Sequence, residues 1–341
     1  MRALFNLPAP AKINWFLHVT GRRPDGYHTL QTVFQFIDWC DTLDLIRRDD
    51  GVIRRIGAED LPEHDLCIRA ARLLQQTTQC PFGADIHLRK SIPQQAGLGG
   101  GSSDAATVLI GLNRLWQLGL SRQTLMQLAL HLGADVPIFI FGRNACAQGV
   151  GEELQEIDLP TPWFAVVHPA RGLSTRAVFC ALDLTSQIPE AKIAGFAEWL
   201  KLNCAESLQG SWQGEQQHKQ QYKQKYKQQC KQRKSEQKSG SMLGKNPMWG
   251  RNDLQQSAMA LEPEVERAMS VLREVLTQNA LQPCFDGRMT GSGSAVFAWI
   301  CDVGKLNARA YGEALIALPA GWQGRLCQGL ARHPLRHWID A

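Results

Sequence analysis

The sequence lacks the features that mark membrane proteins, secreted proteins and structural metal centres. No apolar run approaches the ~20 residues that a membrane-spanning helix needs, and residues 1–8 do not resemble a signal peptide. The 10 cysteines stand singly, without a Cys-x-x-Cys pair or a Cys/His cluster at zinc spacing. We therefore expect a cytoplasmic protein with reduced thiols and no membrane partner.

Strong charge is also missing from most of the chain. The net charge is +5, but residues 209–240 alone contribute +6, with eight Lys/Arg and two Glu, so the rest is about −1. This segment is rich in Gln, Lys and Ser and poor in aliphatic residues, which leaves too little apolar surface to offset its chain entropy. We expect a disordered insertion there, and no specific nucleic-acid partner.

Familiar catalytic and nucleotide-binding fingerprints are absent too. The chain offers no Ser/His/Asp or Cys/His set that would indicate a covalent nucleophile. Its glycine run at 97–101 is not closed by Gly-Lys-[Ser/Thr], and it does not have the G-x-G-x-x-G spacing. The run is therefore neither a Walker A loop nor a Rossmann fingerprint.

What the sequence does contain is a glycine loop that leads into a helix. Four glycines in five positions stand between a proline and two serines, at Pro93, Gly97, Leu98, Gly99, Gly100, Gly101, Ser102 and Ser103. Apolar residues follow at helical spacing over 104–116, and cap-type residues at 102–104 predict that the helix begins where the glycines end. Free N–H groups and the helix dipole would then face an anion, typically phosphate, although a glycine run is also compatible with a simple flexible turn.

The remaining pattern predicts an α+β fold. Alternation and short apolar runs predict strands at residues 9–19, 32–36, 42–46, 84–88, 136–141, 145–150 and 163–167. Helical spacing predicts helices at 66–76, 264–278 and 121–132, the last capped by Ser121 and ended by Gly133. Turns are expected at 21–28 and 287–298, and a second domain near residue 171.

Three polar residues stand out on these elements. Lys12 and Asn14 lie two apart on the first strand and so share one face, although a lysine is most often a solvated edge residue. Asp135 lies in the small-residue bend 133–137, between a helix end and an apolar run. A carboxylate there is either a turn residue that caps its own backbone or a functional acid.

Three separated segments resemble, in order, the motifs of the GHMP kinase family. They are Pro-Ala-Lys-Ile-Asn at 10–14, the glycine loop at 97–106 and Thr-Gly-Ser-Gly-Ser at 290–294. Three further segments resemble a branch of that family whose substrate carries a cytidyl group: Arg-Pro-Asp-Gly-Tyr-His at 23–28, Gly-Ala-Asp-Val-Pro at 133–137 and Arg-Asn-Asp-Leu at 251–254.

The resemblance implies a two-domain α+β architecture and an ATP-dependent small-molecule kinase of isoprenoid precursor synthesis. Residues 1–170 would form a domain like the second domain of ribosomal protein S5, and residues 171–341 a ferredoxin-like domain. Asp135 would be the catalytic base, with Lys12 beside it, and the segment 97–103 would hold the ATP phosphates. The cytidyl substrate would be bound by Asn14, Tyr27, His28, Thr175, Phe179, Gly291 and Ser292.

Some points stay open at this stage. The family usually has an asparagine where this chain has Asp65, which affects the expected adenine contacts. Mg²⁺ is implied as a cofactor, but no motif identifies its ligands, and the oligomeric state, monomer or homodimer, is not indicated. The alternatives are a homoserine- or mevalonate-type GHMP kinase and an RNA-binding protein acting through 209–240.

Overall fold

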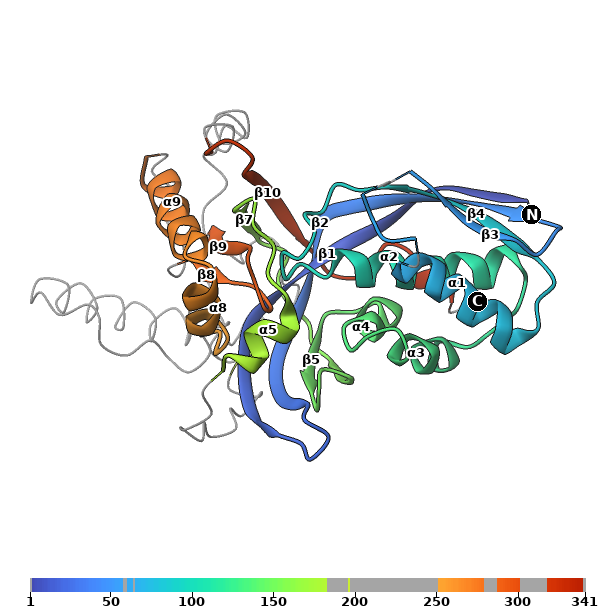
Figure 1. Cartoon of the computed structure of the whole chain (residues 1–341), viewed down its shortest axis with the longest axis horizontal. Coiled ribbons are helices and arrows are strands. Elements are labelled where there is room, and N and C mark those ends of the chain that lie inside the picture. Colours follow the sequence, from blue (N-terminus) through green and yellow to red (C-terminus); the bar gives the residue numbers. More distant parts are fainter. Residues whose placement is uncertain are drawn as a thin grey trace, which may run out of the picture.

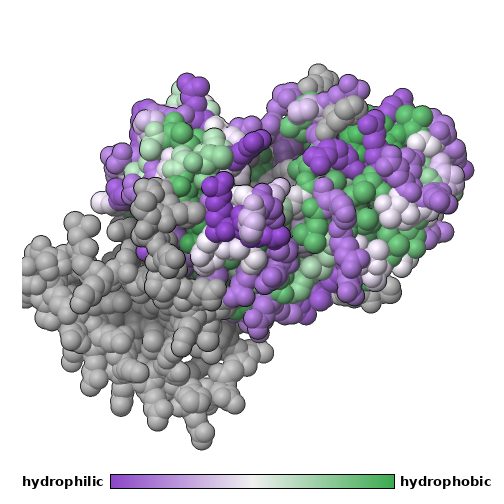
Figure 2. Space-filling model, turned by 60° about the horizontal axis from the view of Figure 1, so that its bottom comes forward, coloured by the Kyte–Doolittle hydropathy of each residue, from purple (hydrophilic) through white to green (hydrophobic). Residues whose placement is uncertain are grey.

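The computed structural model describes residues 2–57, 60–63, 65–182, 196, 251–278, 287–300 and 318–339. The insertion expected at 209–240 lies outside these residues. In the part of the chain that is described, no helix is both long enough and apolar enough to cross a membrane. On the face drawn in Figure 2, hydrophobic and hydrophilic residues are interspersed.

Two long antiparallel strands run through most of the molecule (Figure 1). β1 (Ala3–Arg22) and β2 (His28–Arg48) are joined by a tight turn, and four register shifts interrupt their pairing. Such irregularities bend a strand pair. The strands predicted at 32–36 and 42–46 are both parts of β2, and the strand predicted at 9–19 is part of β1, which begins earlier. Prolines fit into β1 because, among the described strands, it pairs with β2 alone and is an edge strand.

β2 is the organising strand of a mixed sheet. Its strands run in the order β3-β4-β2-β10-β7-β9-β8, with β1 and β5 also paired to β2 and β6 to β5. Among the strands of the described residues, only the pairing of β3 with β4 is parallel. The other strands are β3 (Ile53–Ile56), β4 (Gly83–Arg89), β5 (Ala145–Gln148), β6 (Glu153–Glu156), β7 (Trp163–His168), β8 (Arg288–Met289), β9 (Val296–Ile300) and β10 (Gln323–Leu330).

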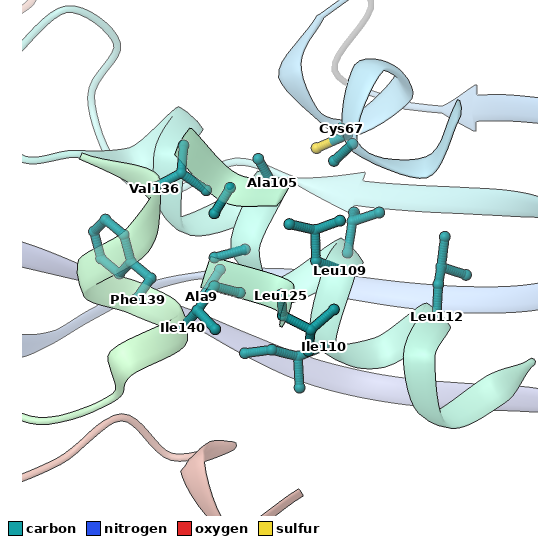
Figure 3. Packing of buried hydrophobic residues seen from close by; sticks show 14 of the residues in the cluster. Ala9, Cys67, Ala105, Leu109, Ile110, Leu112, Leu125, Val136, Phe139 and Ile140 are labelled. Atoms are coloured by element: carbon teal, nitrogen blue, oxygen red, sulfur yellow. The ribbon is translucent and has the colours of Figure 1, made fainter. Parts of the chain in front are cut away.

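Helices cover the sheet in two groups, seen at the two ends of Figure 1. The first group is α1 (Leu66–Thr78), α2 (Gly100–Leu115), α3 (Arg122–Leu130) and α4 (Val136–Phe141). Their apolar faces meet around α2, as Figure 3 shows for Leu109, Leu125 and Phe139. The second group is α5 (Thr175–Cys180), α8 (Gln255–Leu261) and α9 (Glu264–Gln278), which pack with β7 and β9. Helices predicted at 66–76 and 264–278 are confirmed. The division of the chain after residue 170 stays a prediction.

An aromatic cluster lies between these two groups. The rings of Trp15 and Trp299 meet edge to face with their centroids 5.1 Å apart, and the ring of Phe164 lies 5.6 Å from that of Trp15. All three side chains are fully buried. Trp15 belongs to β1, whereas the other two belong to β7 and β9, so this cluster packs the long hairpin against β7 and β9.

Three predictions about helix ends and types are wrong. Residues 136–141 form helix α4, because a short apolar run has no period that separates strand from helix, and Pro137 in the first turn favours a helix. Helix α2 begins at Gly100, inside the glycine run, and Gly99 caps it without a side-chain bond. Ser121 does cap α3, but that helix ends at Leu130, with His131 as a C-cap residue in a right-handed conformation, and Gly133 does not end it.

The buried side chain of Asn144 gives a test of how β2 and β10 are joined. Its Oδ1 accepts from the Phe36 N–H at 3.0 Å, and its Nδ2 donates to the Leu330 carbonyl at 2.9 Å. Asn144→Ala leaves both backbone groups unsatisfied, so we expect a loss of about 2 kcal/mol in the free energy of unfolding, measured in urea. The exposed control Gln328→Ala should change it by less than about 0.5 kcal/mol. Equal effects of the two variants would contradict this role of Asn144.

Candidate active site

A cleft of about 1440 Å³ brings together most of the residues singled out in the sequence. The predicted residues that line it are Lys12, Asn14, Tyr27, His28, Pro93, Gly97, Gly99, Gly100, Gly101, Ser102, Asp135, Thr175, Phe179, Gly291 and Ser292. The side chains of Leu98 and Ser103 are buried and do not line it. The cleft therefore collects segments that are up to 280 residues apart in the sequence.

The glycine loop is shaped by its contact with the second glycine turn. Gly97 and Gly99 have φ values of +72° and +73°, a region that favours glycine. A Cβ on Gly97 would lie 2.2 Å from the Thr290 carbonyl oxygen, and a Cβ on Gly291 would lie 2.8 Å from the Gly97 oxygen. The two backbones can approach this closely only because neither residue has a side chain. Beyond the contact, the first turn of α2 lies open to the cleft.

Lys12 is a buried lysine and not a solvated edge residue. Its side chain is 2% exposed, and its Nζ donates to the Asn14 Oδ1 at 2.8 Å and to the Gly97 carbonyl at 3.0 Å. A third acceptor, the Asp135 Oδ2, lies 3.3 Å away. Because a buried charge needs partners, these contacts fix the ammonium at the point where β1, the glycine loop and the start of α4 meet.

Asp135 faces the cleft and does not cap its own helix. It is the N-cap residue of α4, yet its side chain makes no capping hydrogen bond. The carboxylate is 41% exposed and pairs with Lys12. The interpretation of this residue as a self-capping turn aspartate is therefore wrong, and its second oxygen can accept a proton or a hydrogen bond from a ligand.

Asn14 is held by two threonines, neither of which was among the predicted site residues. Its Nδ2 donates to the Thr32 hydroxyl at 2.8 Å, and its backbone N–H donates to the Thr290 hydroxyl at 2.9 Å. The buried Asn252 donates to the carbonyls of Met289 and Gly291, which fixes the second glycine turn. The segment 251–254 resembles a family motif, but its sequence alone does not indicate that Asn252 braces this turn.

At the other end of the cleft, aromatic rings lie close together. The rings of His28 and Phe179 stack at 5.2 Å with an interplanar angle of 25°. Burial, with the nearby Arg22 charge, lowers the pKa of His28, which favours the neutral ring. Tyr27 is 65% exposed at the rim, and the hydroxyls of Thr175 and Ser292 are 2.8 Å apart. This region can stack a flat ring and hydrogen-bond its edge.

The side chain of Asp65 caps a helix and forms an ion pair within the protein. Its Oδ1 accepts from the backbone N–H groups of Cys67 and Ile68, which caps α1, and its Oδ2 pairs with Arg55. It lines the cleft together with Lys90, a residue that the sequence analysis did not single out. Among the described residues, no three His, Cys, Asp or Glu side chains form a cluster that could hold a metal ion.

Comparisons with known proteins find sequence relatives over nearly the whole chain. The family model "GHMP kinases N terminal domain" matches residues 65–143. The chain is 45% identical over 336 residues to the 4-diphosphocytidyl-2-C-methyl-D-erythritol kinase of Cupriavidus necator, covering 97% of this chain and 95% of the relative. It is 44% identical to the enzyme of the same name from Methylibium petroleiphilum, covering 99% of both chains.

Solved structures give the same result. A crystal structure of 4-(cytidine 5'-diphospho)-2C-methyl-D-erythritol kinase matches with a TM-score of 0.67 and 30% identity, covering 94% of this chain and 98% of that one. A homoserine kinase from Cytophaga hutchinsonii matches with a TM-score of 0.59, covering 98% of this chain and 96% of that one. Its identity is 13%, so this second likeness concerns the fold alone.

The contact between the two glycine segments can be tested by substitution. Gly97→Ala puts a Cβ 2.2 Å from the Thr290 oxygen at a left-handed φ, so we expect a loss of about 3 kcal/mol in the free energy of unfolding. Gly101→Ala is the matched control, because its Cβ would lie 3.6 Å from Leu66 and its backbone is helical. That control should change stability by less than about 1 kcal/mol. Equal stability of the two variants in thermal denaturation would disprove the proposed tight contact.

Proposed function

Because this chain belongs to the 4-diphosphocytidyl-2-C-methyl-D-erythritol kinases of the GHMP kinase family, we propose that its cleft transfers a phosphoryl group from ATP to the 2-hydroxyl of 4-diphosphocytidyl-2-C-methyl-D-erythritol. The activity belongs to the non-mevalonate pathway of isoprenoid synthesis. The observation that carries this assignment is the meeting of Lys12, Asp135 and the glycine loop in one cleft.

Phosphoryl transfer depends on positioning and on charge stabilisation, without a covalent nucleophile. We assign the ATP phosphates to the open first turn of α2, where unpaired N–H groups and the helix dipole favour anions. Asp135 is the base that accepts the proton of the attacking hydroxyl. The Lys12 ammonium, 3.3 Å from that carboxylate, stabilises the negative charge that develops on the hydroxyl oxygen.

The cytidyl group is assigned to the aromatic end of the cleft. Tyr27 and Phe179 offer ring faces for stacking, and the neutral His28 ring offers both a donor and an acceptor to the edge of the base. Asn14, Thr175, Gly291 and Ser292 lie between this end and the Lys12–Asp135 pair in the proposed arrangement, and orient the rest of the substrate. Homoserine and mevalonate have no base to stack, so these rings favour the cytidyl substrate over the alternatives.

The cleft is compatible with Mg²⁺ carried by ATP. Mg²⁺ prefers oxygen ligands and is usually held by phosphates and one or two protein oxygens, not by a dedicated cage. The described residues around the cleft provide no such cage, but the Ser102 hydroxyl, in the first turn of α2 and lining the cleft, is a suitable oxygen donor. Bound there, the ion would neutralise phosphate charge during transfer.

Replacing the proposed base gives the most direct test of this function. Asp135→Asn should keep the fold and lower kcat by about two orders of magnitude or more, because the amide cannot accept the proton. A coupled assay of ADP release with the cytidyl substrate measures it. Asp158→Asn, at an exposed position outside the cleft, is the control and should leave kcat unchanged. Near-normal turnover of Asp135→Asn would refute the role of Asp135.

Lys12→Met tests the second half of the same pair. The substitution removes the ammonium while keeping most of the side-chain volume, so the charge on the reacting oxygen loses its stabilisation. We expect a loss of about two orders of magnitude in kcat, with only a small change in the KM for ATP. A variant that loses ATP affinity but keeps kcat would show instead that Lys12 binds phosphate.

A further inference from the structure

A buried charge cluster lies across the base of the glycine loop. Residue 90 directly follows β4, and residue 104 lies in the second turn of α2, so these two residues flank the glycine loop in the sequence. The Lys90 Nζ donates to the Asp104 Oδ2 at 2.7 Å and also bonds the Asp41 Oδ2. The Lys90 ammonium therefore connects both sides of the loop to strand β2.

β2 also holds the first residues of the loop through their backbone. The Asp41 Oδ1 accepts from the N–H groups of Ser91 and Ile92, the latter at 2.8 Å. Two residues earlier on the strand, the Trp39 Nε1 donates to the Ser91 carbonyl at 3.0 Å. Asp41 thus accepts from three donors. Together these bonds fix the direction and position of the start of the loop relative to β2.

The charges in this cluster do not balance. Asp41 and Asp104 are 0% and 2% exposed, and one ammonium lies between the two carboxyl groups. Asp41 is saturated with donors, whereas the buried Asp104 Oδ1 has no hydrogen-bond partner among the described residues. Burial raises the pKa of Asp104 to about 8, and a proton on this carboxyl group makes the cluster neutral.

We propose that Asp41, Lys90 and Asp104 form a clamp that positions the glycine loop and the first turn of α2 for the ATP phosphates. Asp41 and Asp104 act as positioning residues, since they act through the loop. Lys90 and Asp104 also line the cleft, so the charge of the clamp is felt by a ligand in it. This inference rests on the proposed kinase function and concerns ATP alone of the two substrates.

Two substitutions at Asp104 separate positioning from simple stability. Asp104→Leu removes one of the two acceptors of Lys90, so the KM for ATP should rise on the order of tenfold at pH 7, with kcat and the KM for the cytidyl substrate within about twofold. Asp104→Asn keeps an acceptor and mimics the protonated carboxyl group, so its KM for ATP should match that of the unchanged protein.

A second charge cluster, which lies outside the cleft, provides the matched control. Asp85 of β4 pairs with Arg48 and Arg54 and does not line the cleft. Asp85→Asn should lower the melting temperature without changing the KM for ATP. ATP affinity measured by calorimetry, without the cytidyl substrate, gives a readout that is independent of turnover.

The outcomes distinguish this inference from the proposed function. If the unchanged protein releases no ADP with the cytidyl substrate, the proposed function fails. If it is active, the clamp is refuted when Asp104→Leu keeps the normal ATP affinity, or when both KM values rise together. If Asp104→Leu does not fold, Lys90→Met decides, because it removes the ammonium that connects the loop to β2. Normal ATP affinity of that variant refutes the clamp.

Discussion

The bonds of the Lys12 ammonium hold the candidate site together. It lies almost out of reach of solvent and is bonded to a side chain of β1, a carbonyl of the glycine loop and a carboxylate at the start of α4. A buried ammonium without partners is costly, and removing one partner of a buried pair destabilises a protein by several kcal/mol. Each acceptor is therefore held at a fixed distance from the others. The arrangement that we propose for phosphoryl transfer is therefore part of the folded chain itself.

The loop at this site depends on a second glycine segment almost 200 residues later in the sequence. The backbone at Gly97 lies against the turn that contains Thr290 and Gly291, and Asn252 braces that turn from behind. The Thr290 hydroxyl in turn accepts from the Asn14 N–H. A glycine loop is usually explained by its own conformation, but here Gly97 is also required because the partner backbone leaves no room for a Cβ. The two motifs form one structural unit.

The sequence predicted which residues meet in the cleft better than it predicted the elements that carry them. Lys12, Asp135 and the glycine loop could be singled out because they lie in segments that resemble GHMP kinase motifs. The helix at 136–141 could not, since six apolar residues have no period, and the start of α2 inside the glycines could not, because Gly99 caps it with its backbone alone. The bracing roles of Thr32, Thr290 and Asn252 depend on contacts between segments far apart in the chain. Local patterns contain no trace of such contacts.

The position of β10 has a consequence for how the chain is completed during synthesis. This strand, residues 323–330, lies between β2 and β7 and pairs with both, while β2 itself ends at residue 48. A ribosome delivers the chain from its N-terminus, so β2 waits for a neighbour that emerges nearly 300 residues later. Until then, one edge of β2 and one edge of β7 lack a strand that they have in the finished fold, and an unpaired edge is a template for wrong pairing. The pairing of β10 with β2 and β7 is therefore the last part of the sheet that can form.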